Sequence, residues 1–421
     1  MEKITLPNGF RIILEPVDWA RSATMGIWVG SGSRYETPQT AGVSHFIEHM
    51  LFKGTARRSA LAIAEQMDEI GGALNAYTTK EYTCFYARAL DRHVGTAFDI
   101  LCDMLTQPAL LEKDLQTERG VILEELHMYE DSPEDLCADN LYAGVWQGDM
   151  LGSNILGERK TVSSLTVDDL RAHMRRYYTP ERMVAAVCGR FDREEIVRLC
   201  EKFFGPMTNS GNPVQASPAQ YRKCLTLRKK DFEQTQLALA MPGIGAQDDR
   251  RFAMRLLMSV LGTSSSSRLY QRIREELGLV YEIESFSASY LEAGILGVDM
   301  ALSPRNEKKA LREVFRIIDG FAASLTQREL ARAKEQYLSG LIMNMESTQS
   351  RAAQMGRGEL LYNEVKSADE IMERVRAVTL EEVRTLAEEF LHFDHLSLSA
   401  AGRVKKEKIY EELLHFPPVS A

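Results

Sequence analysis

Residues 42–51 of the chain read Gly-Val-Ser-His-Phe-Ile-Glu-His-Met-Leu, and this stretch says most about the fold and its chemistry. Its apolar residues recur with a helical period, so it predicts a short helix. On that helix His45 and His49 are one turn apart on the same face, close enough to bind a single small cation. Glu48 flanks this face and can reach a metal-bound water without being the main ligand.

A second interpretation of this stretch is an ordinary helix, because two histidines four residues apart often arise by chance. Here, however, the pair accounts for two of only eight histidines, and a glutamate lies between them in an otherwise apolar helix. Burying these three polar side chains without a metal would be costly. The motif therefore favours a metal site, on a helix that Ser44 or Thr40 is expected to cap.

A catalytic zinc ion usually takes three protein ligands and leaves one position for water, and two histidines with one glutamate form a common set. The best source of the third ligand is the helix-like run over residues 114–131. There Glu118 and Glu125 are two turns apart, which places both carboxylates on one face of a helix. A solvated acidic face would explain the same spacing. His127 is two residues from Glu125 and points elsewhere, so we interpret it as structural.

The composition fits a soluble globular protein, and its 421 residues are enough for two domains of roughly 200 residues each. Hydrophobic residues make up 44% and charged residues 26% of the chain. No apolar run approaches the length of about 18 residues that is needed to span a bilayer. The first ten residues lack the pattern of an export signal and predict a strand instead. We therefore expect a cytoplasmic protein without a membrane anchor.

Six cysteines are scattered without a Cys-x-x-Cys pair. This pattern is typical of reduced, mostly buried thiols rather than of disulfides or a cysteine metal site. The formal net charge of −9 argues against nucleic acid as the main partner, because phosphate binding needs clustered lysine and arginine. The acidic excess suits a basic peptide substrate, although it is also common in cytoplasmic proteins.

The polar stretch over residues 209–218 contains two prolines and no apolar periodicity, so it predicts a linker near the midpoint of the chain. Both halves follow one order of expected elements: a strand, a helix, a glycine turn, a hairpin and a second helix. This order starts at residues 23–30 in the first half and at residues 236–241 in the second. It predicts an α+β fold of two similar domains, each a mainly antiparallel sheet covered by helices on one face.

The sequence resembles the inverted-motif (HxxEH) zinc peptidases of the pitrilysin family, in particular the branch that contains the mitochondrial processing peptidase and its bacterial relatives. Two blocks carry the resemblance, residues 45–55 and residues 118–133, and it extends over essentially the whole chain. It implies one Zn²⁺ ion per chain, bound by His45, His49 and Glu125, because the family uses the same separation for its third ligand.

The resemblance also implies roles for residues around the metal. It makes Glu48 the general base and Glu118 an auxiliary acidic residue that supports activity without ligating the metal. In relatives an arginine and a tyrosine from the second half orient the substrate carbonyl, and Arg274 and Tyr281 match them, with Arg272 as the alternate arginine. A surface arginine and a half-buried strand tyrosine would fit the same sequence.

Family members bind peptides by extending an edge strand with backbone hydrogen bonds, and residues 71–80 match that strand. Asn75 and Ala76 are therefore expected to bind substrate. The chain departs from the family pattern at residues 149–152, which read Asp-Met-Leu-Gly where relatives often have His-Pro-Leu-Gly. This loop provides no ligand, so the departure concerns local substrate preference and not zinc binding.

Together with the linker, the resemblance implies a zinc-binding catalytic domain over residues 1–212 and a homologous domain over residues 213–421 that completes the substrate cavity. The implied function is a zinc-dependent endopeptidase that acts on unfolded peptides or presequence-like segments and works as a homodimer. The alternative is a non-catalytic scaffold or partner subunit of the same fold, which in relatives has lost ligands. The full set of ligand and acidic residues favours the enzyme, and the length argues against a single-domain small-molecule hydrolase.

Overall fold

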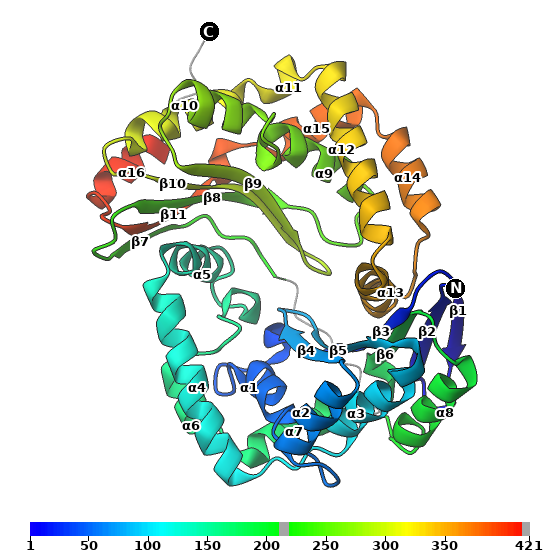
Figure 1. Cartoon of the computed structure of the whole chain (residues 1–421). Helices are drawn as coiled ribbons and strands as arrows, with labels where there is room; N and C mark the ends of the chain where they lie inside the picture. The colour runs from blue at the N-terminus through cyan, green and yellow to red at the C-terminus, as the bar shows by residue number, and fades with distance from the viewer. Residues whose placement is uncertain (210–218, 415–421) are drawn as a thin grey trace. The chain divides into compact units, whose positions relative to one another are not determined.

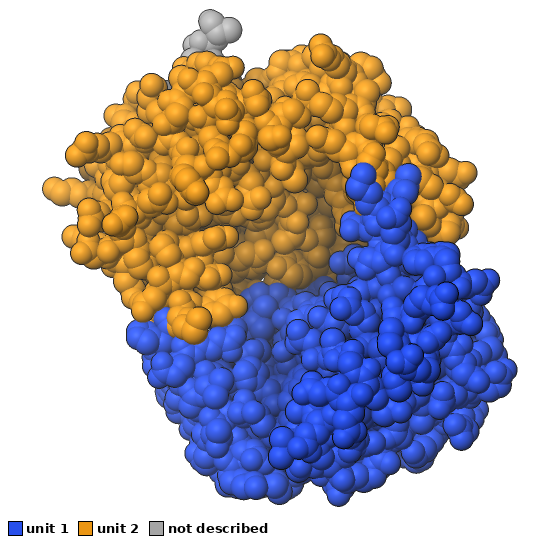
Figure 2. Space-filling view, viewed as in Figure 1, with its two compact units in different colours: residues 1–127, 153–216, 342–366 blue, residues 128–152, 217–341, 367–421 orange. Residues whose placement is uncertain are grey.

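The structure is a computed structural model that describes residues 1–209 and 219–414. Of the expected linker over residues 209–218, only Asn209 is among the described residues. The chain forms two compact units, each assembled from three segments (Figure 2). Unit 1 draws on Met1–His127, Ser153–Ala216 and Ile342–Lys366. Unit 2 draws on Met128–Gly152, Ser217–Leu341 and Ser367–Ala421.

Unit 1 is built on a six-stranded sheet in the order β1-β2-β6-β3-β5-β4 (Figure 1). Neighbouring strands are antiparallel except β2 and β6, which are parallel. The strands are β1 (Glu2–Thr5), β2 (Arg11–Pro16), β3 (Ser22–Val29), β4 (Ala73–Thr78), β5 (Thr83–Leu90) and β6 (Met183–Gly189). The helices are α1 (Val43–Leu51), α2 (Ala60–Glu69), α3 (Val94–Thr106), α6 (Arg159–Ser164), α7 (Val167–Tyr177), α8 (Arg193–Phe204) and α13 (Thr348–Tyr362). A long helix, α4 (Glu112–Asp131), begins in unit 1 and ends in unit 2.

Successive residues of the central strands in unit 1 enter two different apolar layers. In β3, Met25 and Ile27 join the large core that includes residues of α1, α3, α7 and α8. Trp28 points to the opposite face, as strand geometry requires, and packs there with Ala352 and Met355 of α13. Helices therefore lie on both faces of this sheet, and β3 and β6 are buried along nearly their whole length.

Unit 2 is built on a five-stranded sheet in the order β7-β11-β8-β10-β9, antiparallel except for the parallel pair β7 and β11. The strands are β7 (Leu225–Lys229), β8 (Thr235–Gly243), β9 (Glu282–Ser289), β10 (Gly294–Leu302) and β11 (Ser397–Gly402). The helices are α5 (Pro133–Val145), α9 (Arg251–Met258), α10 (Glu307–Asp319), α11 (Phe321–Ser324), α12 (Gln327–Met345), α14 (Ala368–Ala377), α15 (Leu380–Phe390) and α16 (Glu407–Leu414). Of these, α12 begins in unit 2 and ends in unit 1. None of the helices in the described part of the chain is both long and apolar enough to cross a membrane.

The sheet of unit 2 repeats the layering of unit 1. Leu237 and Leu239 of β8 join the main core, whereas Ala238 and Ala240 face the side on which α5 packs. The expected fold class, α+β with two similar and mainly antiparallel sheets, is confirmed. The expectation of helices on one face is incomplete, because one further helix covers the second face of each sheet.

Those two further helices are exchanged between the halves of the sequence. α5 precedes the expected boundary at residue 212 but packs on the sheet of unit 2. α13 follows that boundary but packs on the sheet of unit 1, where Figure 1 shows it beside β3 and β6. An amphipathic pattern identifies a helix with a buried face but not the sheet that it covers, so the sequence alone does not reveal the exchange.

Polar contacts and close packing hold α13 on unit 1. Nε of Arg351 donates to Oε2 of Glu15 on β2 at 2.9 Å, and this pair also makes a second, shorter contact. Gly356 lies so close to the indole of Trp28 that a Cβ at this position would clash with the ring. The helix is therefore matched to this sheet by both charge and shape.

Candidate metal centre

Helix α1, which carries both candidate histidines, begins at an unusual N-terminus. Gly42 has a φ of 94°, in the left-handed region that favours glycine, and a Cβ there would lie 2.5 Å from the carbonyl oxygen of Leu156. The carboxylate of buried Glu36 accepts the N–H of Gly42 at 2.7 Å and the N–H of Ser44 at 2.8 Å. The expected cap by Ser44 or Thr40 is therefore wrong, because an acidic side chain from outside the helix takes that role.

The structure brings together the three candidate ligands. Oε2 of Glu125 on α4 lies 3.7 Å from Nε2 of His45 and 3.6 Å from Nε2 of His49. Atoms that are each about 2.0–2.2 Å from a tetrahedral zinc ion are separated by about 3.3–3.6 Å from one another, so these three atoms fit around one ion. In the described part of the chain, this is the only group of three or more His, Cys, Asp or Glu side chains close enough to share an ion.

The two imidazoles differ in the surroundings that would suit them to metal binding. Burial, and to a smaller extent the neighbouring His49, lower the pKa of His45 to about 3, so its ring is neutral at physiological pH, as a metal ligand must be. Nδ1 of His49 lies 3.0 Å from Oε2 of Glu118. A hydrogen bond at this position places the proton on Nδ1 and leaves Nε2 free for a metal. Glu118 therefore contacts a candidate ligand and lies outside the ligand group.

Glu48 lies beside the candidate ligands and has a fixed partner. The hydroxyl of Thr78, the last residue of β4, donates to Oε2 of Glu48 at 2.5 Å. Burial raises the pKa of Glu48, while this hydrogen bond opposes the change. A carboxylate with a raised pKa is a better proton acceptor, as a general base requires. Thr78 lies in the segment expected to bind substrate, but its contact with Glu48 joins residues too distant in sequence to be predicted.

Strand β4, which contains Asn75 and Ala76, forms one edge of the sheet. Among the described strands it pairs only with β5, and its residues alternate between exposed and half-buried. Its other edge is therefore available to an extended peptide. Thr78 links this edge directly to Glu48, so the strand that would align a peptide also holds the candidate base.

The candidate substrate-orienting residues belong to unit 2, whereas the candidate ligands belong to unit 1. The guanidinium of Arg274 lies over the ring of Tyr270, 4.7 Å from its centroid, and donates to its hydroxyl. Tyr281 is 70% exposed, so it is not the half-buried strand tyrosine of the alternative interpretation. Arg272 is engaged in ion pairs with Glu276 and Glu313. Both arginines therefore contact other residues of unit 2, and the role of Arg274, with Arg272 as the alternate, stays a prediction.

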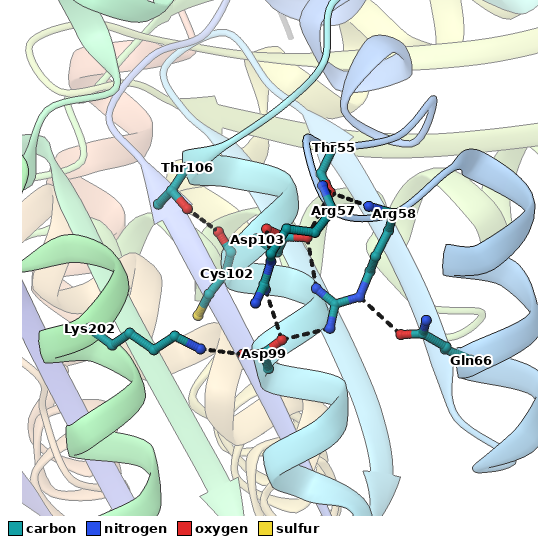
Figure 3. A network of polar contacts seen from close by, with 9 residues as sticks. All are labelled: Thr55, Arg57, Arg58, Gln66, Asp99, Cys102, Asp103, Thr106 and Lys202. Atoms are coloured by element: carbon teal, nitrogen blue, oxygen red, sulfur yellow. Dashed lines mark hydrogen bonds and ion pairs between the residues drawn. The ribbon is translucent and has the colours of Figure 1, made fainter.

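The loop that follows α1 is fixed by a network of polar contacts (Figure 3). Asp103 on α3, which is fully buried, accepts from the hydroxyl of Thr55 at 2.7 Å, from Arg57 at 2.9 Å and from Arg58 at 2.7 Å. Both arginines also bond to Asp99 one turn earlier on the same helix. The C-terminal end of the helix with the candidate ligands is thereby attached to the core of unit 1.

The chain is similar to known proteins over most of its length. Residues 11–159 match the family described as insulinase (peptidase family M16), and residues 164–337 match the peptidase M16 inactive domain. The chain is 39% identical over 400 residues to an uncharacterized zinc protease of Bacillus subtilis, covering 94% of this chain and 97% of that protein. It is 31% identical over 415 residues to a probable mitochondrial-processing peptidase subunit beta of Arabidopsis thaliana, covering 95% of this chain and 78% of that protein.

Solved structures share the fold over nearly the whole chain. A peptidase M16 inactive domain from Pseudomonas fluorescens superimposes with a TM-score of 0.89 at 18% identity, covering 96% of this chain and 98% of that one. A protease from Helicobacter pylori gives the same TM-score and identity, covering 95% of this chain and 98% of that one. At this level of identity the likeness concerns the fold alone.

Proposed function

Because the chain belongs to the insulinase family of peptidases (peptidase family M16), we propose that it is a zinc-dependent endopeptidase that cleaves unfolded peptides or presequence-like segments. Two relatives at 39% and 38% identity, from Bacillus subtilis and Streptomyces coelicolor, are named zinc proteases. The Arabidopsis relative is named for mitochondrial processing, which favours presequence-like substrates. The match of residues 164–337 to an inactive domain supports a single metal centre, in the first half of the chain.

The observation that carries the proposal is the convergence of Nε2 of His45, Nε2 of His49 and a carboxylate oxygen of Glu125 beside a second carboxylate, Glu48. A zinc ion held by the first three would supply the Lewis acidity that polarises a scissile carbonyl. Glu48 would take a proton from the attacking water and pass it to the leaving amine. The hydroxyl of Thr78 keeps one oxygen of Glu48 occupied and so leaves the other for the proton.

The edge of β4 is the proposed position of the substrate. A peptide that adds to this edge is held mainly by backbone hydrogen bonds at Asn75 and Ala76, so the binding tolerates many side chains. This mode needs an extended segment, which explains the proposed preference for unfolded peptides. We propose that Arg274 and Tyr281 of unit 2 orient the substrate carbonyl and stabilise its developing negative charge, as the family resemblance implies.

The variant Glu48→Gln tests the proposed mechanism. It keeps the shape of the side chain and its contact with Thr78 but removes the proton acceptor. We expect zinc content near one ion per chain, as in the wild type, and a fall in kcat on the order of 10²–10⁴-fold on a quenched fluorescent peptide. Zinc content would be measured by elemental analysis on the same samples.

The variant Glu124→Gln is the control, because Glu124 is a neighbouring glutamate on α4 outside the ligand group. Peptidase activity near the wild-type level in zinc-loaded Glu48→Gln protein would contradict the mechanism. A wild-type chain that binds zinc but cleaves no peptide in a broad library would instead favour the non-catalytic partner subunit.

From the resemblance we also expect a homodimer in the cytoplasm. Light scattering of the purified full chain measures the assembly directly. A mass of about twice the 47.5 kDa of one chain is the expected result, and a monomer at micromolar concentration would contradict it.

A further inference from the structure

Lys53 lies two residues beyond the end of α1 and begins a chain of contacts that leads to a candidate ligand. Its Nζ atom is 2.6 Å from Oε1 of Glu118. The other oxygen of the same carboxylate, Oε2, is 3.0 Å from Nδ1 of His49. One carboxylate from α4 is therefore shared between an ammonium group and an imidazole that come from the same short segment of chain.

The burial of these groups shows that the carboxylate needs a charged partner. The side chain of Glu118 is only 5% exposed, whereas that of Lys53 is 35% exposed. A carboxylate removed from water is costly unless it is paired and hydrogen-bonded, and one imidazole N–H supplies a single hydrogen bond. Lys53 supplies a full positive charge from a side chain that still reaches solvent.

The balance of charges around the candidate metal centre also indicates a role for Lys53. Glu48, Glu118 and Glu125 bring three carboxylates to a site for one divalent cation, so one further positive charge is needed for neutrality. Among the described residues, Lys53 is the lysine or arginine that forms an ion pair with one of these carboxylates.

We propose that Lys53 is a positioning residue of the metal centre that acts through Glu118. It holds one carboxylate oxygen so that the other faces Nδ1 of His49, which keeps the imidazole proton on Nδ1 and presents Nε2 to the metal. The inference rests on the proposed zinc site and goes beyond it, because Lys53 touches neither the metal nor the substrate. The competing explanation is a purely structural link between the end of α1 and α4.

Zinc affinity in three single variants separates these explanations. Lys53→Met keeps the side-chain stem and removes the charge, Lys53→Arg keeps the charge, and Glu118→Gln removes the acceptor of the ion pair. Substitutions beside a metal ligand weaken binding about 10–100-fold, and Lys53 is one contact further away, so we expect a roughly 3–10-fold weaker Kd in Lys53→Met. Lys53→Arg should stay within about twofold of the wild type, and Kd would be measured by competition with a chelating dye.

A double variant tests whether Lys53 acts through Glu118. The Kd of Lys53→Met/Glu118→Gln should equal that of Glu118→Gln alone, because the lysine has no effect once its partner has lost its charge. Lys113→Met, at an exposed position of α4, is the matched control and should bind zinc like the wild type.

The tautomer of His49 provides a second readout that a structural link would not change. In metal-free protein at pH 8, the ¹⁵N shifts of the His49 ring should report the Nδ1–H form in the wild type and in Lys53→Arg. Lys53→Met should show an increased share of the Nε2–H form. If Lys53→Met fails to fold, Lys53→Gln replaces it in both measurements.

Three results would overturn the inference: an unchanged Kd with a lowered Tm of the metal-free Lys53→Met protein, additive effects in the double variant, or an unchanged tautomer. Failure of the zinc site itself is recognised separately. If the wild type and Glu125→Ala bind zinc equally, the proposed site is wrong. If Glu125→Ala loses zinc while Lys53→Met binds it like the wild type, only the role of Lys53 is wrong.

Discussion

The residues of the candidate metal centre fall into those that would bind the ion or act as the base and those that hold these side chains in position. His45, His49 and Glu125 point their ligand atoms at one place from two helices. Glu118 contacts a candidate ligand, His49, and Thr78 contacts the candidate base, Glu48. In the proposed mechanism, metal binding and proton transfer would therefore depend on different supporting residues, and substitutions can separate the two.

Replacing any one ligand should remove the zinc ion. His45→Ala, His49→Ala and Glu125→Ala each leave two ligands of three, which is too few for a catalytic zinc site. We expect elemental analysis to find well under one tenth of the wild-type zinc after dialysis against a weak chelator. His127→Ala, on α4 but outside the ligand group, should keep its zinc. Full occupancy in Glu125→Ala would show that the third ligand lies elsewhere.

Replacing Thr78 should slow catalysis without releasing zinc. Thr78→Val has nearly the same shape but loses the hydrogen bond to Glu48, so the carboxylate is no longer held in position. A hydrogen bond to a charged group contributes about 1.5–3 kcal/mol, so we expect a fall in kcat of about 10-fold or more. Thr78→Ser restores the hydroxyl and should recover most of the activity. Equal kcat values for the valine and serine variants would contradict a role for the hydroxyl.

Among the elements, helix α1 depends on a carboxyl group outside itself. Glu36 accepts two backbone N–H groups at the N-terminus of the helix, and these bonds favour its charged form. Burial has the larger effect and raises the pKa of Glu36 to about 7. The position of His45 and His49 therefore depends on a group that titrates near neutral pH.

The stability of unit 1 should fall as this group loses its proton. The pKa of Glu36 is higher in the folded protein than its ordinary value of 4.5, so the folded state binds more protons between about pH 4.5 and 7. The stabilisation that Glu36 gives through its raised pKa is fully present below pH 4.5 and is lost as pH rises through 7. The free energy of unfolding should fall by about 3 kcal/mol over this range, at about 1.36 kcal/mol per pKa unit. Glu36→Gln cannot titrate and lacks this change.

Urea unfolding of metal-free protein at pH 5, 6, 7 and 8 checks this expectation. The difference in free energy of unfolding between the wild type and Glu36→Gln should favour the wild type most at pH 5 and shrink toward pH 8. Taking the difference removes the titrations that both proteins share. A difference that stays constant over this pH range would show that Glu36 does not titrate there.

At the scale of the whole molecule, the exchange of α5 and α13 makes each sheet dependent on the other half of the sequence. Trp28 and its neighbours on β3 are covered by α13, which lies far beyond residue 212. In the same way, Ala238 and Ala240 of β8 are covered by α5, which lies before it. A cut at residue 212 would therefore expose an apolar face on both fragments.

Separate expression of the halves tests this dependence. We expect residues 1–212 alone to be destabilised and to aggregate, because the face that contains Trp28 loses its cover. Adding residues 342–366 through a flexible linker should restore a soluble protein that binds zinc, since all three candidate ligands lie before residue 128. Peptidase activity should return only when residues 213–421 are also present. A fragment of residues 1–212 that is as stable and as active as the whole chain would contradict both expectations.

The features that depend on local spacing could be predicted from the order of the residues. Histidines four residues apart on a helix, and two glutamates two turns apart on another, share a face whatever surrounds them, so the candidate ligands followed from periodicity and resemblance. The α+β class followed in the same way from the repeated order of strands and helices. These patterns are properties of neighbouring residues, and a linear sequence records them directly.

Contacts between residues that are distant in the sequence became known only from the folded chain. The cap of α1 by Glu36, the contact of Thr78 with Glu48 and the pairing of Lys53 with Glu118 each join side chains that no local period relates. The cover of each sheet by a helix from the other half is of the same kind. Burial and packing select these partners as the chain folds. An amphipathic helix or a lone carboxylate is by itself compatible with many neighbours, and only complementary shape and charge in the folded chain single out one of them.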